Sequence, residues 1–393
     1  MNHYLPDGRR ITLKEPAIGS GAEGFVYAIR EHPDLCAKIY LEKHDRARSR
    51  RLTALMRTKP ARWDGDHADH THVAWPVSEI RNDDATVTGF LMPIVDGKKI
   101  TTLFDPVGRA DAVDDPTWRV LLAVAARTAR LLDMLHEAGI VVGDVSPSNV
   151  LVTRTGHVTL IDCDAVQFID PKNDRLYPNT KLTPEYAPPT ASIGGHDRLT
   201  AAHDDFGLAI MVCQMLMEGD HPYEGVLTDA DPDAPDPGIP ENIQQRNNRI
   251  LTPDRFVEVS GGLPATVLPP EVRKLAETCF AAGYSNPTAR PTAREWAEAL
   301  DRAGYQLIGC EKDDNHVYHT SLTACPWCTD IIPPRPAPPP TPPTPSVPLP
   351  PVHQPEPEKP SLWDQLSPAS QTIISVGGFI LMVLFIVWLA SLH

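Results

Sequence analysis

A glycine-rich turn between two strand-like runs is the feature that most constrains the fold of this 393-residue chain. Gly19, Gly21 and Gly24 follow the spacing G-x-G-x-x-G, and Phe25–Ile29 after them is an apolar, strand-like run. Without side chains at these positions, backbone amides can approach triphosphate oxygens closely. A dinucleotide-binding turn of the Rossmann type would open a helix instead of a strand. Taken alone, the pattern is equally consistent with an ordinary glycine hairpin.

Three further polar patterns follow this turn in a fixed order. Lys38 lies within the strand-like run Leu35–Tyr40. Asp144 and Asn149 come after a helical stretch, and Asp162 stands at the end of a hydrophobic strand. Two carboxylates and one amide oxygen suit a hard, oxygen-seeking cation. A solvated lysine or an Asx-turn would explain each pattern singly, so it is their order that favours one common site.

The order and the separations resemble those of bacterial eukaryotic-like (Hanks-type) Ser/Thr protein kinases, over about three quarters of the chain. The resemblance implies an α+β, bilobal fold with a small β-rich N-lobe, residues 1–95, and a helical C-lobe, residues 96–304. The hydrophobic patterns agree with this division. Strands are expected at residues 11–18 and 25–30, Leu35–Tyr40, Val73–Val77 and Thr86–Met92, and helices at Asp45–Arg57, Trp118–Glu137, Asp204–Met217, Pro270–Phe280 and Thr292–Ala303.

The same resemblance implies a role for each residue of the site. Lys38 would hold the α- and β-phosphates of ATP, and Asp144 would act as the base on the substrate hydroxyl; these two are the expected catalytic residues. Asn149 and Asp162 would bind Mg²⁺ or Mn²⁺. The residues expected to contact ATP are Gly19, Ser20, Gly21, Gly24, Val26, Cys36, Lys38 and Leu151.

Segments further along the chain resemble supporting parts of a kinase. Thr183 lies in a Thr-Pro-Glu-Tyr segment like the one that docks substrates in Ser/Thr kinases, where the threonine bonds the catalytic Asp. The segment Asp204–Ala209, which begins with two Asp residues, resembles the helix whose buried Asp braces the catalytic loop, and Arg290 lies in a segment that resembles the end of the large lobe. The implied reaction is transfer of the γ-phosphate of Mg-ATP to Ser or Thr hydroxyls of partner proteins.

The chain also departs from the family pattern. The helix after Lys38 contains no Glu, so Glu42, Asp45 or Glu79 would have to take part in the usual ion pair. The other departures are Val142 and Gly143 before Asp144, Ser146 in place of a phosphate-contacting Lys, Asp162-Cys163-Asp164 as the metal motif, and Thr190 in place of the Glu that would pair with Arg290. These losses keep a nucleotide-binding pseudokinase scaffold open as the alternative to an active kinase.

A Cys- and His-containing stretch, residues 305–332, follows the kinase-like region. Thiolate and imidazole groups at such spacing suit a structural, tetrahedral Zn²⁺ site, and Cys-x-x-Cys forms a typical zinc knuckle. The expected ligands are Cys310, His316, Cys325 and Cys328, with His319 as the competing fourth ligand. A redox-active dithiol and loose reduced thiols are the alternatives.

Two segments of unusual composition come last. Residues 333–365 are proline-rich, which predicts a disordered, extended linker or, alternatively, a docking site for SH3-like or WW-like domains. Residues 372–393 hold about 20 uncharged and mostly apolar residues, enough for one transmembrane helix. Because ATP is cytoplasmic, we expect a tail anchor in the cell membrane with the kinase-like region on the cytoplasmic face. A platform that recruits partners through the zinc module and the proline segment is a further alternative.

Charge and cysteine content exclude other classes of protein. The net charge of −15 argues against general nucleic-acid binding, which requires clustered Lys and Arg. Seven scattered cysteines do not form a disulfide framework, and the first residues lack the apolar core of a secretory signal. ATP, substrate proteins and the membrane are therefore the expected partners.

Overall fold

The computed structural model describes residues 2–21, 23–41, 46–59, 70–179, 181–191, 198–230, 237–257 and 262–328. The chain divides into two units, Met1–Arg335 and Pro336–His393, and the described residues all belong to the first. The proline-rich segment and the apolar segment 372–393 thus lie outside the described residues. Among the helices that are described, none combines the length and the apolar character needed to cross a bilayer.

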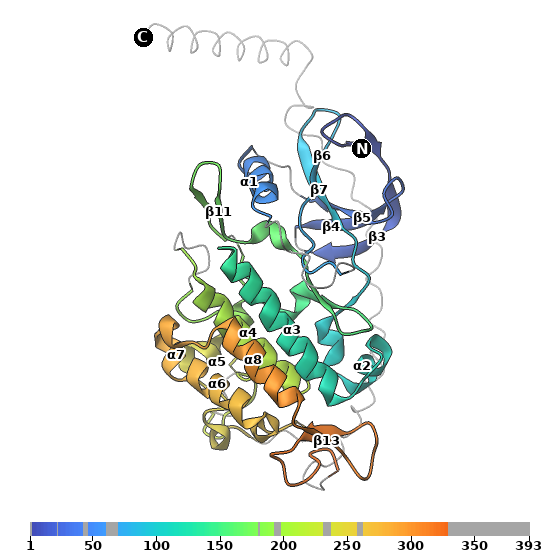
Figure 1. Cartoon of the computed structure of the whole chain (residues 1–393). Helices are drawn as coiled ribbons and strands as arrows, with labels where there is room; N and C mark the ends of the chain where they lie inside the picture. The colour runs from blue at the N-terminus through green and yellow to red at the C-terminus, as the bar shows by residue number, and fades with distance from the viewer. Residues whose placement is uncertain are drawn as a thin grey trace, which may run out of the picture. The chain divides into compact units, whose positions relative to one another are not determined.

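The N-terminal part is a seven-stranded antiparallel sheet (Figure 1). Its strand order is β2-β1-β6-β7-β5-β4-β3. The strands are β1 (His3–Tyr4), β2 (Arg10–Ile11), β3 (Leu13–Gly21), β4 (Gly24–Ile29), β5 (Leu35–Tyr40), β6 (Ser78–Arg81) and β7 (Val87–Pro93). The β3–β4 hairpin carries the glycine-rich turn, as the sequence predicts, with Gly21 opposite Gly24.

Close packing of backbones fixes β5 between its two neighbours. Lys38 pairs with Val26 of β4 on one side and with Phe90 of β7 on the other. A Cβ atom at Gly24 would lie 2.3 Å from the carbonyl oxygen of Ile39, and one at Gly89 would lie 2.0 Å from that of Lys38. Glycine is therefore required at both positions for the strands to approach, and Lys38 is held in an inner strand of the sheet.

One predicted strand is wrong. Val73–Val77 is not a strand; Val73 makes only an isolated bridge to Leu160, and β6 begins at Ser78. Val73 and Trp75 belong instead to the core of the helical part, where the Trp75 indole donates to the carbonyl oxygen of Leu55 at 3.1 Å. A short apolar run has the same composition in a strand and in a buried connection, so its periodicity could not separate the two.

The second part of the structure is mainly helical. In Figure 1, α3 runs through its middle with α4 and α8 beside it. The helices are α1 (Arg46–Arg57), which belongs to the N-terminal part, and α2 (Pro106–Ala112), α3 (Trp118–Glu137), α4 (Ala201–Leu216), α5 (Ile239–Gln245), α6 (Pro270–Phe280), α7 (Ala282–Ser285) and α8 (Ala293–Gly304). The helices predicted at Trp118–Glu137 and Pro270–Phe280 are confirmed with the same bounds, because their apolar residues recur with helical spacing over at least three turns.

The last helix shows how local chemistry sets an element boundary. Thr292 caps α8, its hydroxyl accepting from the backbone amide of Glu295 while the Glu295 carboxylate accepts from the amide of Thr292. This capping box satisfies amides that have no partner within the helix. Just before it, the buried Arg290 donates to the carbonyl oxygens of Gly283 and Ala202 and, at 3.3 Å, to the hydroxyl of Thr190. Thr190 thus lies where the sequence places it, in contact with Arg290.

Short strands lie along the chain between the N-terminal sheet and α4. The strands are β8 (Lys98–Lys99), β9 (Val150–Val152), β10 (Val158–Leu160), β11 (Phe168–Asp170) and β12 (Arg175–Tyr177). The single-turn helices η2 (Pro147–Asn149) and η3 (Cys163–Ala165) stand at the ends of the β9–β10 hairpin. The amide of Ile161 donates to the carbonyl oxygen of Asn149 at 2.8 Å. This bond holds the loop of Asn149 beside the loop that follows β10.

Candidate active site

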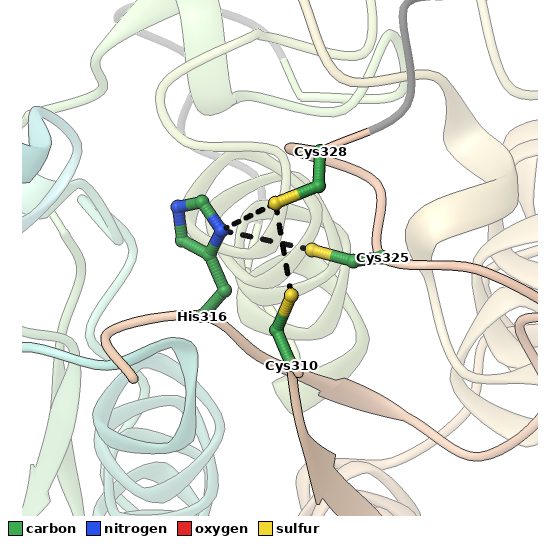
Figure 2. Close-up of side chains that lie close together, drawn as sticks. All are labelled: Cys310, His316, Cys325 and Cys328. Carbon is green, nitrogen blue, oxygen red and sulfur yellow. Dashed lines mark hydrogen bonds between the residues drawn. The ribbon is translucent and has the colours of Figure 1, made fainter. Parts of the chain in front are cut away.

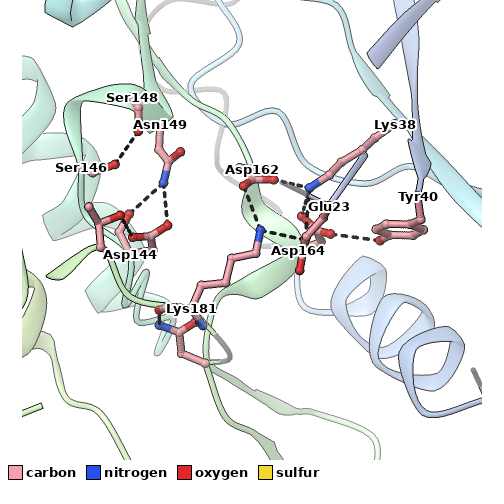
Figure 3. Close-up of polar contacts among 12 residues, drawn as sticks. Glu23, Lys38, Tyr40, Asp144, Ser146, Ser148, Asn149, Asp162, Asp164 and Lys181 are labelled. Atoms are coloured by element: carbon pink, nitrogen blue, oxygen red, sulfur yellow. Dashed lines mark hydrogen bonds and ion pairs between the residues drawn. The ribbon is translucent and has the colours of Figure 1, made fainter. Parts of the chain in front are cut away.

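The centre of the site is a buried lysine surrounded by carboxylates (Figure 3). Lys38 is 6% exposed, and its Nζ pairs with Asp162, lies 2.6 Å from Oδ1 of Asp164, and lies 3.8 Å from Oε2 of Glu23. Lys181 adds a second amine, 2.7 Å from the same Glu23 oxygen and 3.2 Å from Oδ2 of Asp162. The cluster joins three carboxylates and two amines from four separate segments of the chain.

Each charge in this cluster depends on the others. Burial by itself would lower the pKa of Lys38, but the carboxylates of Asp164 and Asp162 raise it above the usual value for lysine. Burial would likewise raise the pKa of Asp162, but Lys38 and Lys181 lower it to about 2. Asp162 has φ 63° and ψ 43°, a left-handed conformation that aspartate tolerates better than most residues. One carboxylate oxygen from each of Glu23, Asp162 and Asp164 lies within 4.8 Å of the others, so the group could hold a metal ion.

A second group of polar residues surrounds Asp144. Its Oδ1 accepts from the hydroxyl of Thr183 at 2.5 Å, and its Oδ2 accepts from Nδ2 of Asn149 at 3.1 Å. Asn149 also donates from Nδ2 to the carbonyl oxygen of Asp144 at 3.0 Å. Because Asn149 donates through its nitrogen, its Oδ1 is the atom left to bind a metal. The contact that the sequence predicts between Thr183 and the catalytic Asp is present.

Asp204 forms hydrogen bonds with the backbone just before Asp144. Its side chain is buried, and it accepts from the amides of Val142 and Gly143, both at 2.7 Å. His136, at the end of α3, also contacts Asp204 at 2.9 Å. Burial would lower the pKa of His136, but the hydrogen bond and the negative charge of Asp204 raise it above its usual value. Of the two adjacent aspartates in the predicted helix, Asp204 is thus the one that fixes the residues just before Asp144, and His136 is part of the same support.

The residues expected to form the adenine pocket occupy the N-terminal sheet and β9. Val26 packs against a hydrophobic cluster that includes Cys36 and Met92. The Cys36 thiol lies 3.7 Å from the carbonyl oxygen of Met92, and burial raises the pKa of this thiol to about 12. Cys36 is therefore a neutral, apolar lining residue. Leu151 lies on β9, where it pairs with Lys99 and Thr159.

The structure corrects the prediction for the carboxylate that pairs with Lys38. Glu79 is not in contact with Lys38; it accepts from the Thr53 hydroxyl at 2.5 Å and from the Arg81 guanidinium at 2.9 Å. Glu42 and Asp45 lie outside the described residues. Among the described residues, Asp164 is a carboxylate that pairs with Lys38, and only its position two residues after Asp162 could have indicated this contact from the sequence.

Helix α1 contacts the same loop through an arginine. Arg51 donates through Nε to the carbonyl oxygen of Asp164 at 2.9 Å, through Nη1 to that of Pro178 at 2.8 Å, and through Nη2 to that of Val166. Helix α1, which contains no Glu, is therefore bound through the Arg51 guanidinium to the backbone of the loop Asp162–Asp164, called the metal loop below. This contact is one that sequence reasoning missed, because five arginines in α1 are indistinguishable without their long-range partners.

A separate cluster lies in the hairpin of β13 (Leu307–Gly309) and β14 (Val317–His319) with the loop after it (Figure 2). Nδ1 of His316 is 3.3 Å from Sγ of Cys328 and 3.7 Å from Sγ of Cys325, and Sγ of Cys310 is 3.6 Å from that of Cys328. Ligands of a tetrahedral zinc ion with Zn–S bonds of about 2.3 Å stand roughly 3.8 Å apart. The four side chains thus have the separations of a zinc site.

His319, the competing ligand, lies elsewhere. Its Nδ1 is 2.8 Å from the Ser321 hydroxyl and also accepts from the Ser321 amide at 3.1 Å, and the side chain is buried. Of the two histidines, His316 is therefore the one that belongs to the cluster of thiols.

The Cys/His cluster is connected to the helical core. The His316 ring lies 5.3 Å from the ring of Trp327, whose indole donates to Oε2 of Glu218 at 3.1 Å. The other oxygen of Glu218 pairs with Arg109, which is 3% exposed. Arg109 lies on α2 and Glu218 follows α4. A displacement of Trp327 would therefore disturb the contacts of Glu218 within the kinase-like part.

The fold and the site define a protein kinase. The chain belongs to the protein kinase family, because the family model described as "Protein kinase domain" matches residues 13–300. The relationship to protein kinases predicted from the sequence is confirmed, and the kinase domain implies use of ATP and Mg²⁺.

Among known proteins, the chain is 33% identical over 324 residues to "Protein kinase YegI" of Escherichia coli O157:H7, covering 79% of this chain and 48% of that protein. It is 26% identical over 191 residues to "Serine/threonine-protein kinase PknA" of Mycobacterium tuberculosis, covering 47% of this chain and 42% of that protein. These homologues support the enzyme class of protein serine/threonine kinases. The chain spans about half the length of the curated relatives it matches first.

The solved structure described as "ROP18 kinase domain in complex with AMP-PNP and sucrose" matches with a TM-score of 0.51 and 16% identity. The match covers 77% of this chain and 82% of that one. At this identity the likeness shows the bilobal kinase fold alone.

The role of Asp164 can be tested with Asp164→Asn. Loss of its charge removes one of the two close carboxylates of Lys38, so we expect kcat/KM for Mg-ATP to fall at least about tenfold. Asp114→Asn is the control, since it removes the charge of an exposed acid that pairs with Arg154; it should change kcat/KM by less than about threefold. An equal loss in both variants would contradict the assignment of Asp164.

Proposed function

We propose that this chain is an active kinase that transfers the γ-phosphate of Mg-ATP to Ser or Thr hydroxyls of partner proteins. The observation that carries the proposal is the placement of Asp144. Its carboxylate is oriented by both Thr183 and Asn149 and stands on a loop bonded to the one that carries Asp162. A base fixed by two donors is suited to orient and deprotonate a substrate hydroxyl.

The remaining groups fit the nucleotide side of the reaction. The β3–β4 turn presents backbone amides for phosphates, and Lys38 can exchange part of its carboxylate contacts for phosphate oxygens. Asn149 and Asp162 would hold Mg²⁺, which neutralises phosphate charge when it is bound. Catalysis of this kind depends on positioning and electrostatics, and Lys38, Asp144, Asn149 and Asp162 are all in place.

The departures from the family pattern support the alternative, a scaffold that binds ATP without turnover. The strongest of them is the missing helix Glu, and the contact of Asp164 with Lys38 at 2.6 Å supports the active kinase against it. The same residues would bind nucleotide in a scaffold, so the two functions differ only in turnover. Thr183, which resembles the docking threonine of Ser/Thr kinases, favours Ser or Thr hydroxyls as acceptors.

A phosphotransfer assay separates the two functions. The full chain, purified in detergent, is given γ-labelled Mg-ATP with itself and a generic basic protein as acceptors. We expect incorporation of label that falls at least about 10³-fold in Asp144→Asn, because the base is lost while the loop is kept. Asp114→Asn, an exposed acid paired with Arg154, is the control and should leave the rate unchanged. Nucleotide binding without any incorporation by the unaltered chain would favour the scaffold.

We propose further that Cys310, His316, Cys325 and Cys328 bind one structural Zn²⁺. The thiol and imidazole donors have the separations that zinc requires, and all four positions are taken by protein, which is typical of structural sites. A hairpin this small buries too little apolar surface to be stable by itself, so metal binding would supply much of its folding free energy. Through Trp327 and Glu218 the metal would also stabilise the helical part.

Two histidine variants test the zinc site. His316→Ala should lose bound zinc, whereas His319→Ala should retain about one zinc ion per chain, measured by metal analysis of the purified protein. Removal of zinc by a chelator should also lower the thermal midpoint of the unaltered chain, because Trp327 loses its support. Retention of zinc by His316→Ala and its loss from His319→Ala would reverse the choice of ligand.

We propose that residues 372–393 anchor the protein in the cell membrane, with the kinase domain on the cytoplasmic face and residues 333–365 as the spacer. The support is the sequence alone: a run of about 20 uncharged residues matches the thickness of the hydrocarbon core, and ATP is available in the cytoplasm. Docking of SH3-like or WW-like domains on the proline-rich segment is the alternative use of the spacer.

Membrane fractionation tests the anchor. The full chain should stay in the membrane pellet after an alkaline carbonate wash, which releases peripheral proteins, because a spanning helix cannot leave the bilayer. A chain shortened before residue 372 should appear in the supernatant. Release of the full chain by carbonate would show that the apolar segment does not span the membrane.

A further inference from the structure

The catalytic loop of this chain lacks a positive charge. Ser146 stands where the family pattern has a lysine that contacts the transferred phosphate, and between Asp144 and Asn149 there is no Lys or Arg. Ser146 is 1% exposed, and its hydroxyl lies 2.8 Å from that of Ser148. The loop is therefore neutral apart from Asp144, although a transferring phosphoryl group needs nearby cations.

Lys181 brings an amine to this region from another segment. Its Nζ lies 2.7 Å from Oε2 of Glu23, beside the glycine-rich turn, and 3.2 Å from Oδ2 of Asp162 (Figure 3). Two residues later, Thr183 donates to Asp144. One short segment thus contacts the base, the metal-binding aspartate and the turn that covers the phosphates.

The backbone of Lys181 is fixed on both sides. On one side Asn179 accepts from the amide of Lys181 at 2.9 Å and donates to its carbonyl oxygen at 2.6 Å. On the other side Thr183 is held by Asp144. The Lys181 side chain therefore extends from an anchored position into the site.

A second departure from the family pattern makes room for this anchor. Gly143, which replaces the usual arginine before Asp144, has φ +74°, and a Cβ atom there would lie 1.8 Å from Nδ2 of Asn179. Any other residue at position 143 would displace Asn179 and strain the backbone. Glycine at position 143 thus leaves the space for Asn179, and Asn179 in turn holds the backbone of Lys181.

Lys181 is charged where it lies. Its Nζ lies between two carboxylates, those of Glu23 and Asp162, which are the partners expected of an ammonium group. Its side chain is 23% exposed, so it can change partners without crossing a packed core. A γ-phosphate, which carries more charge than a carboxylate, would compete effectively for it.

We propose that Lys181 is the cation that contacts the γ-phosphate of ATP in this protein, in place of the lysine missing at position 146, and that Glu23 holds it when no nucleotide is bound. The proposal rests on the proposed function. In the reaction the bond between the γ-phosphorus and the oxygen of ADP breaks, and a bond forms from that phosphorus to the substrate oxygen. The hydroxyl proton passes to Asp144, while Lys181 neither gives nor takes a proton.

The test compares Lys181→Met and Lys181→Arg in the full chain purified in detergent. Affinities for Mg-ADP and for a non-hydrolysable Mg-ATP analogue are measured by calorimetry, and kcat is measured separately. We expect Lys181→Met to bind the ATP analogue about tenfold more weakly with Mg-ADP affinity unchanged, because only the analogue has a γ-phosphate. Its kcat should fall about 10²-fold, and Lys181→Arg should keep more of both quantities than Lys181→Met.

Lys172→Met, which removes an exposed lysine between β11 and β12, is the matched control and should bind both nucleotides as the unaltered chain does. Equal loss of ADP and analogue binding in Lys181→Met would assign Lys181 a structural role, and no loss of either would remove it from the site. The two affinities, for Mg-ADP and for the Mg-ATP analogue, are measured without any transfer of phosphate. If the unaltered chain fails to transfer phosphate but Lys181→Met still loses affinity for the analogue alone, the contact stands and the proposed activity fails.

Discussion

The buried ion pairs of Lys38 connect the two parts of this protein. Lys38 comes from the N-terminal sheet, whereas Asp162 and Asp164 follow β10 in the helical part. A buried amine is stable only with carboxylates at hydrogen-bond distance, and the carboxylates need the amine in the same way. Because separation would leave the largely buried Lys38 amine unpaired, these ion pairs favour one relative position of the sheet and the loop Asp162–Asp164. The nucleotide site depends on that position.

Helix α1 contributes a cation to this arrangement, where the family pattern has an acid. In the family pattern an acid on the helix pairs with the lysine of the sheet, but here Arg51 donates to backbone carbonyl oxygens on and after the metal loop. The helix is thereby coupled to the loop that carries Asp162 and Asp164, and its Leu52 also packs in one hydrophobic cluster with residues of β5, the strand that carries Lys38. A displacement of α1 would therefore disturb both the loop Asp162–Asp164 and the strand that carries Lys38, which are the two sides of the candidate site.

Elements that are specified by a pattern within a short stretch of sequence could be predicted. Helical periodicity was sufficient for α3 and α6, and the glycine spacing located the turn above Lys38. The other members of the charge cluster around Lys38 could not be predicted in the same way, since Glu23, Asp164 and Lys181 are brought together only by the fold. The wrong strand at Val73–Val77 has a related cause. Val73 and Trp75 are buried in the cluster that includes the helical core, a contact that no pattern within five residues can reveal.

The departures from the family pattern are linked to one another in space. Asp164 supplies the carboxylate missing from α1, Gly143 leaves room for Asn179, and Asn179 anchors Lys181 close to Asp162. If the chain had lost its catalytic role, substitutions at these positions would have no reason to compensate for each other in charge. Instead, one carboxylate lost from α1 is replaced by Asp164, and one amine lost from the catalytic loop is matched by Lys181. These two replacements keep a carboxylate beside Lys38 and an amine beside Asp162, and they support the proposed phosphotransfer over an inert scaffold.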